Sequence, residues 1–475
     1  MLKRCFFGAL LLIAMQRAIA APIIENDDIQ LKPRIVILTD IAPAHIEPDD
    51  MESMIRLLAH ADLYEIEALI ATGGWNNSDR SYPSNWIDSL KITIEAYEKD
   101  LPNLMKRSGQ SNFLSFEKES EYQKMGYWPS ADYLKSRIMF GSLDLGYARI
   151  GNDNNSAGSD FIIKLAEEDD KRPVWVLVWG GGNTLAQAIW KVKQQRSEAE
   201  VKKFLHKLRV YTITDQDVPI KEAKNYTFSS HQWMRKECGK DLYFIWDESA
   251  WLSQNSIGSS RWKEYAAQIQ GHGNLGKIYP KYKWGVEGDT PSFLHVMPTG
   301  LNDPSVYNQA GWGGYFEWAM SMDGKTSCFT NSSSSTKEIS KKYENYFYPA
   351  IFANFAARMD WAKDGKGNRN PAITVNNKDG MDILYMHPKA GKKVVLDASK
   401  SIDPDGDSLH YKWWILPEAG TYKNEIAILN ADTDQTTIMV PDDAVGKTFH
   451  VICEVLDSGI PGLTSYRRII FEPYK

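Results

Sequence analysis

Apolar residues in the first three quarters of the chain alternate between short continuous runs and one-sided helical stripes. Residues 35–38 read Ile-Val-Ile-Leu, a run typical of a strand buried on both faces. From Asp49 onward, apolar residues recur at helical spacing. This alternation predicts an α/β domain in which helices flank a mostly parallel sheet. Further strands are expected at residues 65–71, 173–179, 208–214 and 242–246, and helices at residues 87–99, 161–168, 184–194 and 336–362.

The pattern changes at residue 363. Residues 363–370 are polar and rich in glycine and asparagine, as in a linker. Short strands separated by turn residues follow, which predicts an all-β sandwich. They are expected at residues 393–396, 409–413, 436–440, 448–455 and 467–471. The expected domains are thus an α/β domain at residues 31–362, a linker at 363–370 and a sandwich at 371–475.

The amino-terminal residues are typical of a secretory signal peptide. Lys3 and Arg4 precede a short apolar run, and Ala-Ile-Ala at residues 18–20 forms a cleavage site. Residues 1–20 are therefore expected to be removed, and the protein to be periplasmic or secreted. No other apolar stretch is long enough to span a bilayer. Cys238, Cys328 and Cys453 remain, too few for a disulfide framework, although one bridge is possible.

Charge and composition narrow the choice of partner. The chain has 55 basic and 61 acidic residues, a formal charge of −6, which gives no basic footprint for nucleic acid or an anionic membrane. Its 16 Trp and 23 Tyr residues are the one unusual feature. Such rings suit the apolar faces and hydroxyl edges of sugars, although most are expected in the core.

Carboxylates gather where strands are expected to end, which is where ligands bind in open α/β sheets. Asp40 ends the first strand, and Asp49 and Asp50 open the next helix. A helix N-terminus accounts for one such acid. Several carboxylates at one junction repel each other unless a cation compensates, and oxygen-only ligands favour a hard cation such as Ca²⁺.

Two later segments offer oxygens to the same edge. Asp215 and Asp217 follow a strand, and Glu287 and Asp289 lie in a Gly- and Pro-containing loop; turns explain both equally well. Three glycines at residues 180–182 join a strand to a helix and allow a ligand to approach the backbone. This segment lacks the spacing of the phosphate-binding glycine motifs.

Several motifs carry a family resemblance. Leu-Thr-Asp at 38–40, the Asp-Asp pair and Ala-Thr-Gly-Gly-Trp-Asn at 71–76 resemble the opening of the nucleoside hydrolase fold. The chain is similar to a secreted bacterial family labelled nucleoside hydrolase-like, often cellulose-binding, which ends in a β-sandwich. The motifs that carry this second resemblance are Glu-Pro-Asp-Asp at 47–50, Asp-Gln-Asp at 215–217, Glu-Gly-Asp-Thr-Pro-Ser-Phe at 287–293 and Gly-Trp-Gly-Gly at 311–314.

The resemblance implies roles for individual residues. Asp40 corresponds to the aspartate that binds calcium and deprotonates the attacking water, with Asp50, Asp289 and the backbone carbonyl of Trp179 as further calcium ligands. Asp49 and Asn76 correspond to residues that hold the sugar. The remaining residues expected around the substrate are Glu47, Trp75, Asn183, Asp215, Asp217, Glu287 and Trp312.

The chain departs from nucleoside hydrolases in two places. Eight residues separate Asp40 from Asp49, where nucleoside hydrolases have three, so Glu47 can add a ligand or the loop can reshape the pocket. Gly288 stands where many of them carry a histidine that assists the leaving group. The possible replacement acids are His45, His231 and His295, although a lone histidine is more often structural.

The carboxyl-terminal domain has a resemblance of its own. Residues 397–407 (Asp-Ala-Ser-Lys-Ser-Ile-Asp-Pro-Asp-Gly-Asp) resemble polycystic-kidney-disease-type immunoglobulin-like domains. The acidic stretch at 403–407 offers oxygens for calcium but lacks the register of an EF-hand loop, so a β-turn is expected. Trp413 and Trp414 alternate across a strand, so one should fill the core and the other face out.

Three functions remain open at this point. The first is a calcium-dependent glycosidase that cleaves the N- or O-glycosidic bond of a furanoside or small glycoside, with Asp40 as general base. The second is a non-catalytic protein that binds carbohydrate through the same acidic and aromatic residues. The third is a scaffold that calcium only stabilises. The sugar, its anomer, the leaving-group acid, the oligomeric state and any polysaccharide binding by the sandwich stay open.

Overall fold

The computed structural model of the chain describes residues 31–78, 80–113, 124–218, 226–302 and 310–475. An eight-stranded sheet with the order β3-β2-β1-β4-β5-β6-β8-β7 organises the larger domain. All neighbouring strands in it are parallel except β7 and β8, which confirms the predicted fold class. The strands are β1 (Arg34–Thr39), β2 (Glu65–Ala71), β3 (Ile138–Phe140), β4 (Val174–Val178), β5 (Leu208–Ile213), β6 (Tyr243–Asp247), β7 (Glu317–Met320) and β8 (Ser327–Thr330).

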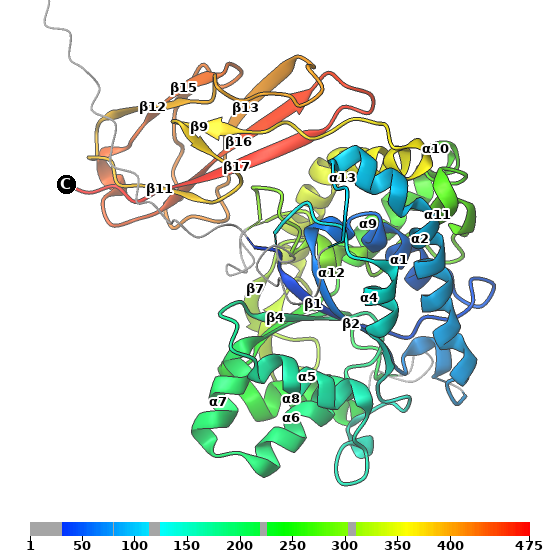
Figure 1. Ribbon diagram of the computed structural model, residues 1–475. Coiled ribbons are helices and arrows are strands. Elements are labelled where there is room, and N and C mark those ends of the chain that lie inside the picture. The colour runs from blue at the N-terminus through cyan, green and yellow to red at the C-terminus, as the bar shows by residue number, and fades with distance from the viewer. Residues whose placement is uncertain (1–30, 79, 114–123, 219–225, 303–309) are drawn as a thin grey trace, which may run out of the picture.

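Helices cover both faces of this sheet (Figure 1). In β1, Ile35 and Ile37 pack on one face and Val36 and Leu38 on the other, so an unbroken apolar run serves two cores. The Val36 face carries α5 (Ala157–Glu167), α6 (Asn183–Gln195), α7 (Glu198–Lys207) and α8 (Ser230–Cys238). The Ile35 face carries α1 (Asp49–Leu58), α2 (Asp88–Ser108), α4 (Ala131–Ser136), α9 (Ala250–Ser260), α10 (Trp262–Gln268), α11 (Gly273–Ile278), α12 (Thr290–Leu294) and α13 (Ser334–Asp364).

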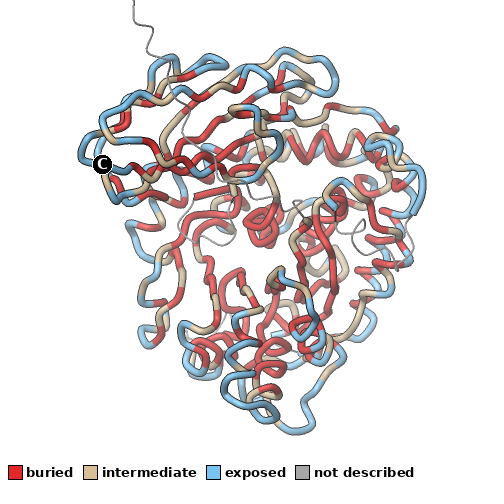
Figure 2. Tube along the Cα trace, turned by 60° about the vertical axis from the view of Figure 1, so that its left-hand side comes forward, coloured by how far each residue is buried: buried red, intermediate tan, exposed pale blue. Residues whose placement is uncertain are grey.

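Short 3-10 turns connect several of these elements. They are η1 (Ala61–Leu63), η2 (Trp75–Asn77), η3 (Ser84–Ile87), η4 (Tyr147–Arg149), η5 (Tyr226–Phe228), η6 (Gly239–Asp241) and, in the second domain, η7 (Asp442–Ala444). Buried residues follow the strands and the inner sides of the helices, and exposed residues lie outside (Figure 2). None of the helices in the described ranges is both long and apolar enough to cross a membrane. The predicted signal peptide, residues 1–20, lies outside the described residues.

Two facing sheets form the smaller carboxyl-terminal domain, as predicted. One has the order β11-β17-β16-β13, with β11 (Leu384–Met386), β13 (Leu409–Ile415), β16 (Phe449–Asp457) and β17 (Thr464–Phe471). The other has the order β12-β15-β14, with β12 (Lys393–Asp397), β14 (Ile428–Leu429) and β15 (Gln435–Met439), and β9 (Thr374–Val375) pairs with β10 (Lys378–Asp379). Trp413 lies in the core between the sheets, whereas Trp414 packs on Tyr346 of α13.

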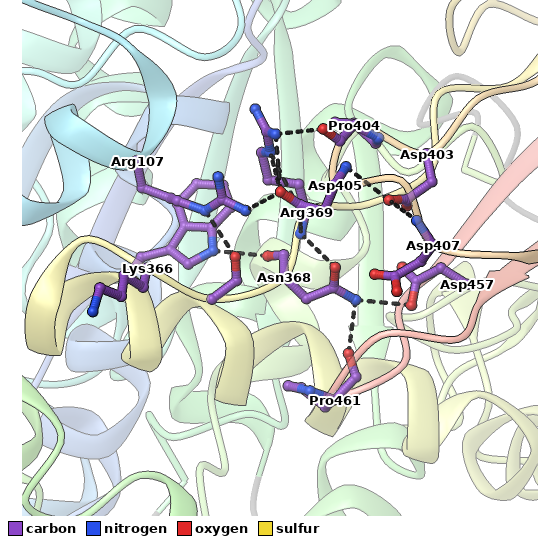
Figure 3. A network of polar contacts seen from close by, with 12 residues as sticks. Arg107, Lys366, Asn368, Arg369, Asp403, Pro404, Asp405, Asp407, Asp457 and Pro461 are labelled. Atoms are coloured by element: carbon purple, nitrogen blue, oxygen red, sulfur yellow. Dashed lines mark hydrogen bonds and ion pairs between the residues drawn. The ribbon is translucent and has the colours of Figure 1, made fainter.

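The segment expected to be a linker is held by polar contacts between the domains (Figure 3). Arg107 of α2 and Arg369 of the linker both pair with Asp405 of the sandwich, and Asn368 donates to Asp457 at 2.8 Å. The backbone N–H of Gly406 donates to the carbonyl of Asp403, which confirms the β-turn expected there. This turn therefore supplies an ion-pair partner to the larger domain.

All three cysteines of the described chain are buried and free, so the one possible disulfide bridge does not form. Cys238 and Cys328 lie in the core on the Val36 face of the large sheet, and Cys453 lies in the sandwich core. Burial raises the pKa of the Cys238 and Cys328 thiols to about 12, which keeps them protonated and unreactive.

Candidate functional site

Three segments of the α/β domain bring carboxylates together at the carboxyl edge of the large sheet. Asp40 directly follows β1, Asp49 and Asp50 begin α1, and Asp289 directly precedes α12. One oxygen from each of Asp49, Asp50 and Asp289 lies within 4.8 Å of the other two. These four residues and Glu47, which precedes α1, are called the acidic cluster below.

Hydrogen bonds orient the two carboxylates nearest β1. Asp40 Oδ2 accepts from the backbone N–H of Asn76 at 2.8 Å, and the Asn76 side chain donates to the Asp40 carbonyl at 3.0 Å. Thr39 Oγ1 donates to Asp50 Oδ1. A Cβ atom at Gly74 would lie 2.3 Å from the Asp40 carboxylate, so this glycine lets the loop after β2 close over it. Asn76, predicted from the resemblance, thus lies directly beside Asp40.

Burial makes the charged forms of these carboxylates costly. It raises the pKa of Asp40 to about 7, although the backbone N–H of Asn76 opposes the rise. Burial, reinforced by the charge of Asp49, raises the pKa of Glu47 to about 9. Burial and the neighbouring carboxylates also raise the pKa of Asp50 and Asp289 well above the ordinary value. The cluster therefore ionises fully only beside a compensating cation.

The donor atoms of the cluster fit such a cation. Asp289 Oδ2 is buried and has no hydrogen-bond partner among the described residues. Asp289 offers an oxygen to the same group as Asp49 and Asp50. Divalent cations that prefer oxygen ligands bind to carboxylate groups of this kind. Asp49 was expected to hold the sugar, but its carboxylate lies close enough to those of Asp50 and Asp289 to share a metal ion with them. The carbonyl of Trp179, an expected ligand, accepts a hydrogen bond from Gln216 Nε2.

Asp215 and Asp217 form a second group with His231, at the start of α8. Asp215 Oδ2 accepts from Ser229 Oγ at 2.5 Å, and Asp217 Oδ2 accepts from the backbone N–H of Ser230 at 2.8 Å. One ligand atom from each of the two aspartates and His231 lies within 4.8 Å of the others. These two aspartates, expected near the substrate, are therefore engaged with the N-terminus of α8.

Glu287 lies in a buried polar network. Its carboxylate pairs with Arg56 of α1 and accepts from Tyr279 Oη at 2.8 Å. The side chains of Arg56 and Glu287 are 2% and 3% exposed. The pair ties α1 to the loop that carries Asp289. The structure therefore gives Glu287 a positioning contact, and Arg56 is a residue that sequence reasoning missed.

The predicted aromatic residues fall in different places. Trp75, half-buried in η2, donates from Nε1 to the Val218 carbonyl at 2.8 Å and lies next to Asn76. Trp179 is fully buried and donates to Ser292 of α12. Trp312 is also buried and meets Tyr466 of the sandwich edge-on, so it lies at the contact between the domains.

Among the remaining predicted residues, Asn183 begins α6, and its Nδ2 donates to the Gly146 carbonyl at 2.5 Å. His295 is buried among aromatic rings, and His231 is buried beside Asp215. His45 is exposed on the loop before α1. Of the three candidate acids, only His45 is in contact with solvent.

Comparison with known proteins agrees with this architecture. Residues 34–316 match a family described as "Cellulose-binding Sde182, nucleoside hydrolase-like domain", and residues 393–473 match "Cellulose-binding protein Sde0182, C-terminal domain". A solved structure from Saccharophagus degradans, described as a nucleoside hydrolase-related hypothetical protein associated with carbohydrate metabolism, is 34% identical. The match covers 93% of this chain and 100% of that one, with a TM-score of 0.77.

Two further solved structures match at much lower similarity. The effector protein XOO4466 is 10% identical with a TM-score of 0.32, and the type III effector XopQ complexed with adenosine diphosphate ribose is 11% identical with a TM-score of 0.28. Each covers 71% of this chain and 94% of its own. None of the curated proteins compared with the chain matches it.

The parallel sheet and the carboxylates at its carboxyl edge define the class of the larger domain as nucleoside hydrolase-like. The chain belongs to the cellulose-binding Sde182 nucleoside hydrolase-like family and carries the carboxyl-terminal domain of that family. Thr39 and Gln216 are site residues that sequence reasoning missed. Both lie beside a predicted acid in the sequence, and that proximity is the only signal that marks them.

Proposed function

We propose that the chain is an exported, calcium-dependent hydrolase that cleaves the N- or O-glycosidic bond of a furanoside or small glycoside. The observation that carries this proposal is the acidic cluster, in which Asp40 lies beside a group of adjacent carboxylate oxygens and is held by Asn76. Buried carboxylates at one strand edge are costly to the fold, so their presence together argues for a ligand.

In this proposal, Asp40, Asp50, Asp289 and the Trp179 carbonyl hold the calcium ion. Asp49 is close enough to share that role. Bound calcium would offset two of the cluster's negative charges and lower the pKa of the attacking water. Asp40 accepts the proton from that water, because its carboxylate is fixed in orientation by the N–H of Asn76.

Sugar recognition falls to the residues around Asp40. The Asn76 side chain beside the cluster and the Glu47 carboxylate within it offer hydrogen bonds to vicinal hydroxyls. Trp75 in η2 follows β2, and Asn183 at the start of α6 follows β4. His45 is the candidate leaving-group acid, because it alone of the three histidines is exposed.

The test is turnover of a panel of nucleosides and aryl furanosides, in calcium and in chelator. Wild type should hydrolyse at least one substrate only in calcium. Asp40→Asn should lower kcat/KM by about 10²–10⁴-fold, as expected for loss of a general base. Asp160→Asn, which alters a partly exposed carboxylate on α5, is the matched control. Turnover that persists in chelator, or in Asp40→Asn, would contradict the proposal.

The second candidate is a non-catalytic carbohydrate-binding protein. Trp284 favours it, because this ring is 76% exposed and its segment contacts the loop before α1 through Lys283, which donates to the Ile46 carbonyl at 2.9 Å. An exposed ring beside polar groups suits stacking on a sugar face. Absence of turnover over the whole panel, together with calcium-dependent affinity for an oligosaccharide, would favour binding.

A further inference from the structure

The group formed by Asp215, Asp217 and His231 has unused ligand atoms in a buried place. His231 is fully buried, and neither of its ring nitrogens has a hydrogen-bond partner among the described residues. Asp217 Oδ1 is likewise buried and unpartnered there. Because such polar atoms are normally satisfied in native structures, three of them at one point call for an explanation.

The spacing of these atoms is unsuited to a hydrogen bond and suited to a metal. His231 Nδ1 lies 3.6 Å from Asp215 Oδ1, beyond hydrogen-bond reach. Two ligands of a tetrahedral zinc ion, each about 2.1 Å from the metal, lie about 3.4 Å apart. The nitrogen and the oxygen therefore stand at nearly the separation that two ligands of one ion adopt.

The neighbouring side chains hold both carboxylates in place for such a role. The hydroxyl of Ser229 donates to Asp215 Oδ2, and the backbone N–H of Ser230 donates to Asp217 Oδ2. The Oδ1 atom of each aspartate is therefore left to bind a metal ion together with His231. Ligand carboxylates in metal sites are commonly oriented by hydrogen bonds of this kind. Asp215 Oδ1 receives in addition only a 3.3 Å contact from the Asp217 N–H.

The glycine turn after β4 closes the site. A Cβ atom at Gly181 would lie 2.5 Å from Asp217 Oδ1, and one at Gly182 would lie 2.6 Å from His231 Nε2. Since the Nε2 edge of the ring faces this backbone, Nδ1 is the nitrogen left to bind. Fully enclosed sites of this kind are typical of structural metals.

We infer that Asp215, Asp217 and His231 bind a first-row divalent transition metal ion, with zinc as the test ion, and that this ion fastens the end of β5 to the start of α8. One imidazole and two carboxylates favour such an ion over calcium, which prefers oxygen ligands. This site is separate from the acidic cluster and does not depend on the proposed hydrolase activity.

The test is zinc binding by the full chain in excess calcium, which competes with zinc for the all-oxygen ligands of the acidic cluster. Wild type should bind one equivalent of Zn²⁺ and unfold at a higher temperature with it. His231→Gln and Asp217→Asn should each lose that equivalent and the thermal shift. Asp289→Asn should keep both, and so should His206→Gln, which alters an exposed histidine that pairs with Asp241. Binding that survives His231→Gln would overturn the inference.

A second measurement does not depend on any variant. Crystals of wild type grown with Zn²⁺ should show an anomalous scattering peak between His231 Nδ1 and the Oδ1 atoms of the two aspartates. A peak only in the acidic cluster or on the surface, or no zinc at all, would show that the group is a plain buried histidine–aspartate contact.

Discussion

Asp289 is the residue at which the charge of the acidic cluster is tested most directly. Asp289→Asn keeps the shape of the side chain and removes a buried carboxyl group whose ionisation is opposed by burial and by the neighbouring carboxylates. Without calcium, the variant should therefore be more stable than wild type, by about 1–3 kcal/mol. With calcium at 100 times its Kd, wild type should gain about 2.7 kcal/mol and the variant much less.

Thermal unfolding in chelator and in excess calcium measures both effects of Asp289→Asn. Asp160→Asn, with its carboxylate on the surface of α5, serves as the control and should follow wild type in both conditions. If Asp289→Asn and wild type respond equally to calcium, Asp289 is not a ligand.

Trp284 is the residue that tests sugar binding apart from catalysis. Trp284→Ala should weaken affinity for a cello-oligosaccharide by about 0.5–1.5 kcal/mol, roughly 2- to 13-fold, without changing stability, because the ring is mostly in solvent. Trp318→Ala is the matched control, since Trp318, on the lateral edge strand β7 of the sheet, is 38% exposed and lies against Lys240. Calorimetric titration of both variants makes the comparison, and equal affinities would exclude Trp284 from the binding surface.

At the scale of elements, the ion pair between Arg56 and Glu287 fixes α1 against the loop before α12. Glu287→Gln leaves a buried guanidinium without its counter-charge and should lower the free energy of unfolding by about 3–5 kcal/mol. Adding Arg56→Met should recover part of that loss, because the unpaired charge is then gone. Urea unfolding measures both; a double variant no more stable than Glu287→Gln would argue against this ion pair.

His295 couples the packing of α12 on the sheet to pH. It lies among the rings of Trp175, Tyr211 and Phe316, and burial lowers its pKa to about 3. The unfolded chain, with a histidine pKa of about 6.5, therefore binds a proton that the native state does not. This contribution to stability is complete above pH 6.5 and is lost as the pH falls toward 3.

The variant His295→Phe should remove that dependence. Between pH 7 and pH 5, wild type should lose about 2 kcal/mol more stability than the variant. Urea unfolding at the two pH values measures the difference, with His206→Asn, an exposed histidine, as control. Equal losses in wild type and His295→Phe would show that His295 accepts a proton in the native state.

The elements that could be predicted are those whose apolar pattern is local. Strands β1 and β4 contain continuous apolar runs and β2 ends in one, and the structure places all three almost where the pattern does. Strand β3 has only three residues and β7 only four, so their apolar residues form runs too short to mark a strand. Their pairing depends on distant partners, which a local pattern cannot reveal.

The same limit applies to the site. Asp40, Asp49 and Asp50 were predictable because a strand end and a helix start adjoin in the sequence. The contact between Arg56 and Glu287 joins residues 231 positions apart, and no pattern in the sequence around either residue predicts it. The backbone of the glycines at 180–182 lies against the side chains of Asp40, Asp217 and His231, and the local sequence does not indicate these contacts.

At the scale of the whole molecule, the sandwich and the α/β domain share one extended contact. Tyr466 of β17 packs edge-on against Trp312 and against Phe347 of α13. Arg468 donates to the Leu301 carbonyl at 2.7 Å, and the ion pairs of Asp405 close the contact near the linker (Figure 3). Apolar and polar contacts from both ends of the sandwich thus restrain it on the larger domain.

This contact predicts that the two domains unfold together. Scanning calorimetry of wild type should give a single endotherm, because separating the domains exposes buried rings from both. Tyr466→Ala removes the ring that contacts both Trp312 and Phe347, so the endotherm should split in two. Tyr474→Ala, whose ring is 55% exposed at the carboxyl terminus, should leave a single endotherm. Two endotherms in wild type would mean that the domains are only tethered, and the sandwich could then move independently of the acidic cluster.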